Sequence, residues 1–211
     1  DNINSLPPIP GEGTAGYLSI KYSHPEWLVQ YLIDCKGYDF TEAFLRCCNS
    51  PAPLSIQVNT LKVSAADYAR ALARAELEYE CCDEPVGCIT LQGGSATELP
   101  GFDEGLFYVQ DRAARMAVEI AAPKAGMRVL DACSCPGGKS FAAAIAMGNR
   151  GSILACDIHE KKLRLVRDGA QRLGIDVIET AAMDARAFRA ELAESFDVVI
   201  ADVPCSGFGV I

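Results

Sequence analysis

Only two histidines occur among the 211 residues, and no pair of the ten cysteines has the C-x-x-C spacing of a zinc site. Two pairs of cysteines are adjacent, whereas Cys133 and Cys135 are separated by one residue. We therefore expect no metal site. Most of the cysteines are interpreted as reduced, buried thiols that pack as small apolar side chains.

Long apolar runs are also missing, and no stretch approaches the roughly 20 residues that cross a bilayer. The first residues are polar and rich in Pro and Gly, unlike a signal peptide. Positive charge is scarce, because 19 Lys and Arg stand against 28 Asp and Glu, for a net charge of −9. These features predict a cytoplasmic globular protein without a membrane partner, in which nucleic acid would need a local basic surface.

Two groups of basic residues could supply such a surface, although each also fits a solvated helix face. The first group comprises Lys161, Lys162, Arg164, Arg167 and Arg172, and the second comprises Arg112, Arg115, Lys124 and Arg128.

The most informative stretch is residues 129–140, Val-Leu-Asp-Ala-Cys-Ser-Cys-Pro-Gly-Gly-Lys-Ser, which predicts a strand, a tight turn and a helix start. Gly137 and Gly138 permit positive φ and bring backbone N–H groups close to a ligand. The dinucleotide pattern G-x-G-x-x-G is absent, and Cys133 replaces the first glycine of the phosphate-loop pattern G-x-x-x-x-G-K-[ST]. A nucleoside ligand fits best, and a phosphate-loop nucleotidase is the alternative.

From Arg112 onward, apolar strand patterns alternate with helical ones, which predicts a doubly wound parallel sheet. Gly137, Asp157, Asp184 and Asp202 all fall at the carboxyl ends of predicted strands, where such sheets bind ligands. Asp157 lies about 20 residues past the glycines, the spacing of a ribose-binding acid. Asp157 also fits a solvated loop carboxylate, and Asp184 fits the N-cap of a short helix after it.

The predicted organisation has a linker over residues 1–21, a helical lead-in and small subdomain over 22–111, and a Rossmann-like region over 112–211. The small subdomain has a β-α-β-β-β pattern between residues 54 and 109. Ser23-His24-Pro25-Glu26 has the pattern of a capping box that opens a helix with Trp27 and Tyr31 at helical spacing.

Two motifs, Asp131–Ser140 and Asp202–Gly209, together resemble the signatures of the RNA cytosine-5 methyltransferases of the Sun/Fmu group. The family usually has Ala-Ala at Ser134-Cys135 and Thr at Ser140, so the replacements remain small. Residues 22–29 are similar to the bacterial 16S ribosomal RNA branch of this family. The resemblance implies an α/β fold: the first four parallel strands of a Rossmann-like S-adenosylmethionine-dependent methyltransferase sheet, preceded by a small α+β RNA-binding subdomain.

The same resemblance implies methylation of carbon 5 of a cytosine in 16S ribosomal RNA, as naked or early-assembly RNA, through a covalent cysteine adduct. It assigns the ribose to Asp157, the adenine to Asp184, and a place beside both cofactor and base to Asp202. It assigns the methionine part of S-adenosyl-L-methionine to Cys133, Ser134, Cys135, Pro136, Gly137, Gly138 and Lys139.

Cys205 resembles the cysteine that assists product release, and an inert buried thiol is its alternative interpretation. The attacking cysteine of the family would lie beyond Ile211, and a NusB-like domain would precede residue 1. The chain is therefore expected to be an inactive fragment of the enzyme. A non-catalytic RNA- or nucleotide-binding fragment is the alternative function.

Overall fold

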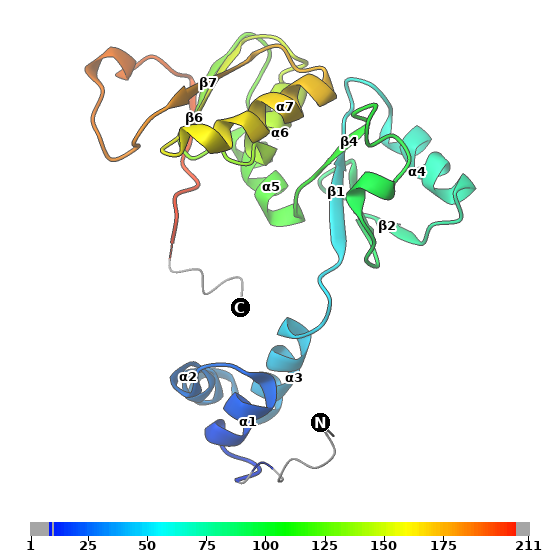
Figure 1. Ribbon diagram of the computed structural model, residues 1–211, viewed down its shortest axis with the longest axis vertical. Coiled ribbons are helices and arrows are strands. Elements are labelled where there is room, and N and C mark those ends of the chain that lie inside the picture. Colours follow the sequence, from blue (N-terminus) through cyan, green and yellow to red (C-terminus); the bar gives the residue numbers. More distant parts are fainter. Residues whose placement is uncertain (1–8, 10, 206–211) are drawn as a thin grey trace. The chain divides into compact units, whose positions relative to one another are not determined.

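The computed structural model describes residue 9 and residues 11–205 (Figure 1). The chain divides between Pro51 and Ala52 into a helical unit and a larger α/β unit. Among the described residues, none of the helices combines the length and the apolar character that a bilayer crossing requires.

The helical unit packs its helices around Leu18, Val29 and Leu45, which are fully buried. Its helices are α1 (Ala15–Tyr22), α2 (Glu26–Lys36) and α3 (Tyr38–Cys48). The expected linker over residues 1–21 is therefore wrong for its last part, since residues 15–21 belong to α1. Helix α1 forms because Thr14 caps it by accepting a hydrogen bond from Tyr17 N and because Leu18 is buried on one face.

The expected capping box at Ser23 is also wrong. Ser23 adopts the left-handed conformation (φ 58°) and ends α1, while Pro25 precedes α2 without a side-chain cap. A residue in the left-handed region cannot serve as an N-cap, which requires extended backbone. Trp27 and Tyr31 are 59% and 61% exposed, so α2 buries its Val29 face instead.

The first sheet of the α/β unit is antiparallel, with strand order β2-β3-β1-β4. It confirms the predicted β-α-β-β-β pattern, and its core joins Tyr68 and Leu72 of the helix to Ile56 and Phe107 of the strands. Its elements are β1 (Leu54–Val58), α4 (Ala65–Arg74), β2 (Tyr79–Cys81), β3 (Cys88–Leu91) and β4 (Phe107–Val109).

The second sheet is parallel, with order β7-β6-β5-β8, and confirms the predicted Rossmann-like arrangement. The chain moves outward from β5 through β6 to β7 and then returns to place β8 on the other side of β5. This reversal creates the crevice in which open α/β sheets bind ligands. The strands are β5 (Arg128–Asp131), β6 (Ser152–Asp157), β7 (Ile178–Ala182) and β8 (Val198–Ile200), and the helices are α5 (Arg112–Ala121), α6 (Gly138–Ala146) and α7 (Leu163–Leu173).

Hydrogen bonds connect the C-terminal end of α7 to the antiparallel part of the α/β unit. The buried Asn59 side chain donates from Nδ2 to Gly105 O and to Leu173 O, both at 2.9 Å. Arg172 donates from Nη1 to Phe102 O at 2.5 Å, with its guanidinium 4.3 Å from the Phe102 ring centroid. Arg172 therefore serves this joint and does not belong to an exposed basic cluster.

Asn59→Ala is expected to reduce the free energy of unfolding by roughly 2–4 kcal/mol, because two carbonyl groups at the joint lose their donor. Urea denaturation would measure the loss. Arg164→Ala removes an exposed ion pair with Asp168 on α7 and should cost less than about 1 kcal/mol. Equal losses in the two variants would contradict the role of Asn59.

Candidate functional site

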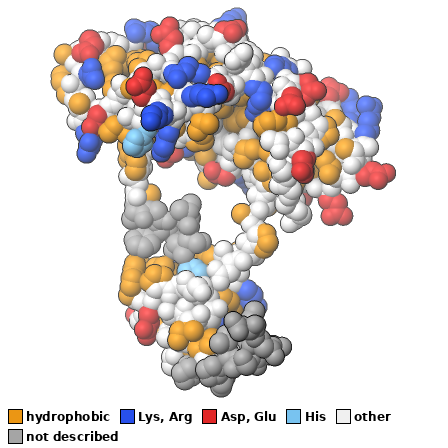
Figure 2. Space-filling model, in the orientation of Figure 1, with side chains coloured by type: hydrophobic (Ala, Val, Ile, Leu, Met, Phe, Trp, Pro, Cys, Tyr) orange, Lys and Arg blue, Asp and Glu red, His pale blue; other side chains and the backbone are white. Residues whose placement is uncertain are grey.

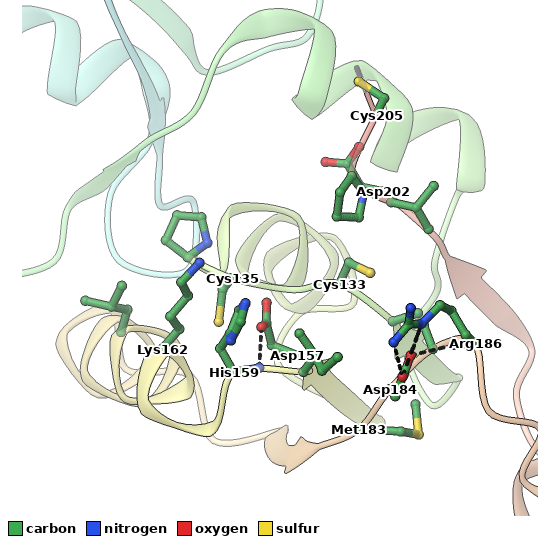
Figure 3. Close-up of a pocket in the computed structure, with 17 residues that line it drawn as sticks. Cys133, Cys135, Asp157, His159, Lys162, Met183, Asp184, Arg186, Asp202 and Cys205 are labelled. Atoms are coloured by element: carbon green, nitrogen blue, oxygen red, sulfur yellow. Dashed lines mark hydrogen bonds and ion pairs between the residues drawn. The ribbon is translucent and has the colours of Figure 1, made fainter. Parts of the chain in front are cut away.

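A cavity of about 950 Å³ lies at the carboxyl ends of the parallel strands (Figure 3). Its volume falls within the range of small-molecule sites. The structure brings several of the predicted site residues to this one place, although they come from separate segments of the chain. The predicted residues that line it are Cys133, Cys135, Pro136, Asp157, Asp184, Asp202 and Cys205.

The remaining predicted residues lie in the β5–α6 loop and at the start of α6. Ser134, Gly138 and Lys139 border a second cavity of about 200 Å³, which shares Cys133, Cys135, Pro136 and Asp202 with the first. Gly137 lines neither cavity. It precedes α6 with φ 119°, and a Cβ there would lie 2.4 Å from Phe141 Cζ, so only glycine fits the turn that starts the helix.

Asp131, the last residue of β5, connects the β5–α6 loop to α6 through a hydrogen bond. Its side chain is completely buried, and Oδ2 accepts a 2.7 Å hydrogen bond from Ser140 Oγ. Burial raises the pKa of this carboxyl above its ordinary value. The family usually has threonine at this position, and Ser140 provides the same hydroxyl group for the hydrogen bond to Asp131.

The thiols of Cys133 and Cys135 form part of the wall beside Asp157. Burial, reinforced by the negative charge of Asp157, raises the pKa of both thiols, that of Cys135 to about 11. At neutral pH both side chains are therefore protonated. This wall is neutral and does not present a thiolate nucleophile.

Asp157 ends β6 and faces the cavity in Figure 3. Its Oδ1 accepts a 2.8 Å hydrogen bond from His159 N, which orients the carboxylate across the following turn. The next residue, Ile158, is 53% exposed and provides an apolar wall. A carboxylate can accept hydrogen bonds from sugar hydroxyls and an apolar surface can contact a base, so this combination suits a nucleoside.

Asp184 follows β7 and forms an ion pair with Arg186, drawn in Figure 3. Its Oδ1 also accepts from Arg186 N at 3.0 Å. The alternative interpretation of Asp184 as a helix N-cap is therefore wrong, since turns follow Asp184 and its carboxylate accepts from the residue two positions later. Hydrogen bonds from Arg186 lower the pKa of Asp184 to about 2.

Asp202 and Lys139 connect the end of β8 to the start of α6. Lys139 Nζ lies 2.5 Å from Asp202 Oδ2, and the two residues are 63 positions apart in the sequence. Cys205 follows on the same segment and is exposed, which contradicts the buried-thiol interpretation. Residues 206–209 of the second motif lie outside the described residues.

Sequence reasoning missed several lining residues. Most of them lie within two positions of a strand-end acid, and that position was their only signal. Lys162 and Leu165 come instead from the helical turns after β6 and had no such signal. The missed lining residues are Ala132, Ile158, His159, Lys162, Leu165, Met183, Ala185, Arg186, Val203 and Pro204.

Two arginines of the basic group around α7 have partners within the α/β unit. Arg164 pairs with Asp168, and Arg167 donates to Thr180 Oγ1 at 2.8 Å. Acidic and basic side chains are interspersed on the face of the α/β unit shown in Figure 2. The solvated-face interpretation therefore fits Arg164, which is 79% exposed.

Comparisons with known proteins agree with this geometry. The family described as 16S rRNA methyltransferase RsmB/F matches residues 118–211, and the ferredoxin-like domain of RsmF/B-like methyltransferases matches residues 24–98. The crystal structure of a methyltransferase homologue from Pyrococcus horikoshii superposes with a TM-score of 0.79 at 26% identity, covering 92% of this chain and 63% of that one.

The curated relatives include a probable ribosomal RNA small subunit methyltransferase B from Bacillus subtilis, which is 36% identical over 195 residues. The match covers 92% of this chain and 44% of the relative. Ribosomal RNA small subunit methyltransferase F from Serratia proteamaculans is 33% identical, with 80% of this chain and 36% of the relative covered. The chain thus spans less than half the length of these relatives. Residues 24–98 and 118–211 therefore carry the ferredoxin-like domain and the methyltransferase domain of the RsmB/F family.

Proposed function

We propose that the protein containing this chain methylates carbon 5 of a cytosine in 16S ribosomal RNA, with S-adenosylmethionine as methyl donor. The observation that carries the proposal is the convergence of Asp157, Asp184 and Asp202 with the β5–α6 loop on one 950 Å³ cavity. These groups come from neighbouring parallel strands, as the ligand site of an open α/β sheet requires.

The chemistry of the lining residues fits the cofactor. Asp157 would accept hydrogen bonds from the ribose hydroxyls, and Ile158 and Met183 would contact the adenine faces. Asp184 would accept from the adenine amino group. Cys133, Cys135 and Pro136 of the loop line the cavity and would contact the methionine part. The cofactor would supply an electrophilic methyl group on a positively charged sulfur, which suits a cavity with three carboxylates.

The second cavity is our candidate for the target base. Asp202 would accept from the cytosine N4 amino group, and Lys139 would donate to N3 or O2, because cytosine presents a donor next to acceptors on this edge. The cavity shares Cys133 and Asp202 with the larger one, so a base there would lie beside the cofactor. Such a base has to leave its stack, which favours naked or early-assembly RNA in the cytoplasm.

The reaction needs a thiolate because carbon 5 of cytosine is a poor nucleophile. Addition of a cysteine thiolate to carbon 6 creates an enamine, whose carbon 5 then takes the methyl group. Loss of the carbon-5 proton to a base restores the double bond and expels the thiolate. The attacking cysteine would lie beyond Ile211, and Cys205 would assist release of the product.

A thermal-shift comparison tests the cofactor class. S-adenosylhomocysteine at 100 times its Kd should raise the free energy of unfolding by about 2.7 kcal/mol, which corresponds to several degrees in Tm, whereas ATP with Mg²⁺ should have no effect. The reverse result would favour a phosphate-loop nucleotidase. Stabilisation by neither ligand would favour a non-catalytic RNA-binding role.

A further inference from the structure

Arg186 contacts Asp184 through its backbone and its side chain together. Arg186 Nε lies 2.9 Å from Asp184 Oδ1, and Nη2 lies 2.7 Å from Oδ2. The backbone N–H of Arg186 also donates to Oδ1. Both residues line the large cavity, and Figure 3 shows the pair at one edge of it.

These contacts fix the carboxylate of Asp184 in a single orientation. A carboxylate offers about four acceptor sites. The backbone N–H donates to Oδ1 and Nη2 donates to Oδ2, whereas Nε donates to Oδ1 at 2.9 Å with a longer contact to Oδ2 at 3.2 Å. The planar fork of an arginine holds both oxygens, which a lysine ammonium cannot do. Oδ2 therefore makes one short hydrogen bond, and its second lone pair, which makes only the longer contact with Nε, can accept from a further donor.

The ion pair contributes little to folding. The Arg186 side chain is 83% exposed, and exposed ion pairs typically have small effects on stability. The ion pair lies on the cavity wall, where it can act on ligand binding. An acceptor held in one orientation discriminates between ligands that differ by one hydrogen-bond donor.

We propose that Arg186 is a positioning residue that orients Asp184 to accept the exocyclic amino group of adenine, and so sets the preference of the cofactor site for adenosine. The proposal rests on the function proposed above. It predicts that removing Arg186 weakens and broadens cofactor binding while leaving the fold unchanged.

Calorimetry on the full-length protein would test this with S-adenosylhomocysteine and S-inosylhomocysteine, in which an oxo group replaces the adenine amino group. The wild type should prefer the adenosyl ligand. Arg186→Ala should weaken binding of the adenosyl ligand roughly 5- to 20-fold and reduce the preference for it over the inosyl ligand. Arg186→Lys should give an intermediate loss. Arg189→Ala, which removes the exposed pair with Glu191 outside the cavity, is the matched control and should bind as the wild type does.

The pH dependence separates positioning from a merely structural role. In the wild type Asp184 stays ionised down to about pH 2, so its protonation should not affect binding between pH 7 and pH 4. Without Arg186 the pKa of Asp184 returns toward its ordinary value, and affinity should then fall as the pH approaches 4. The Tm of the variant without ligand should stay within about 1 °C of wild type.

A double-mutant cycle completes the test. In an Asp184→Asn background, Arg186→Ala should cause little further loss, because the group that it positions is already changed. Wild-type affinity in Arg186→Ala, or an equal loss in both backgrounds, would overturn the proposal while leaving the cofactor assignment intact. Failure of the wild type to bind S-adenosylhomocysteine would instead overturn the proposed function itself.

Discussion

Asp157→Ala should weaken binding of S-adenosylmethionine roughly 10- to 100-fold. The Asp157 carboxylate lies at the cavity edge, where His159 N orients it, and a charged acceptor of ribose hydroxyls is worth roughly 1.5–3 kcal/mol. Calorimetry with S-adenosylhomocysteine measures the loss directly. The effect should be larger than that of Arg186→Ala, because Asp157 would contact the ligand itself.

Asp168→Ala is the matched control for this variant. It removes the same charge from an exposed position on α7, where Asp168 pairs with Arg164, and Asp168 does not line the cavity. Comparing the two variants separates a specific contact with the ligand from the general loss of one negative charge. An unchanged affinity in Asp157→Ala would remove this residue from the cofactor site.

The positions of Asp157 and Asp202 could be predicted because each acid ends a short apolar run. Such runs mark buried parallel strands, and their carboxyl ends meet at one edge of the sheet whatever the strand order. The pairing of Lys139 with Asp202 could not be predicted in this way. It depends on β8 lying next to β5, which the local sequence of neither segment records.

The failures of sequence reasoning have local physical causes. The Ser23 pattern resembles an N-cap, but the same residue ends the preceding helix in a left-handed conformation. Arg172 resembles a surface cation, but its guanidinium donates to the carbonyl groups of Phe102, before β4, and of Phe107, in β4. Asp184 also fits the pattern of a helix N-cap, but its carboxylate forms an ion pair with Arg186 instead. In each case a contact with a nearby or distant residue overrides the local pattern.

Cys205→Ala in the full-length protein should give the largest change in reaction outcome. If Cys205 assists release, the variant should complete methylation but retain RNA as a covalent adduct, because the carbon-5 proton is not removed and the attacking thiolate cannot leave. Cys205 is exposed and lines the large cavity, and it follows Asp202, which borders both cavities, so its position suits a role beside the target base. A denaturing gel with substrate RNA and S-adenosylmethionine would detect the adduct as a slowly migrating band.

Other roles for Cys205 predict different gels. If Cys205 were the attacking thiolate, its removal would abolish both methylation and the adduct, since no bond to carbon 6 could form. If the thiol had no chemical role, turnover would stay near normal and no band would accumulate. Cys88→Ala, which removes a buried thiol from the ferredoxin-like sheet, serves as the control for a simple packing loss and should accumulate no adduct. Methylated RNA held covalently by Cys205→Ala alone would thus assign release to this residue, and its absence would reject that assignment.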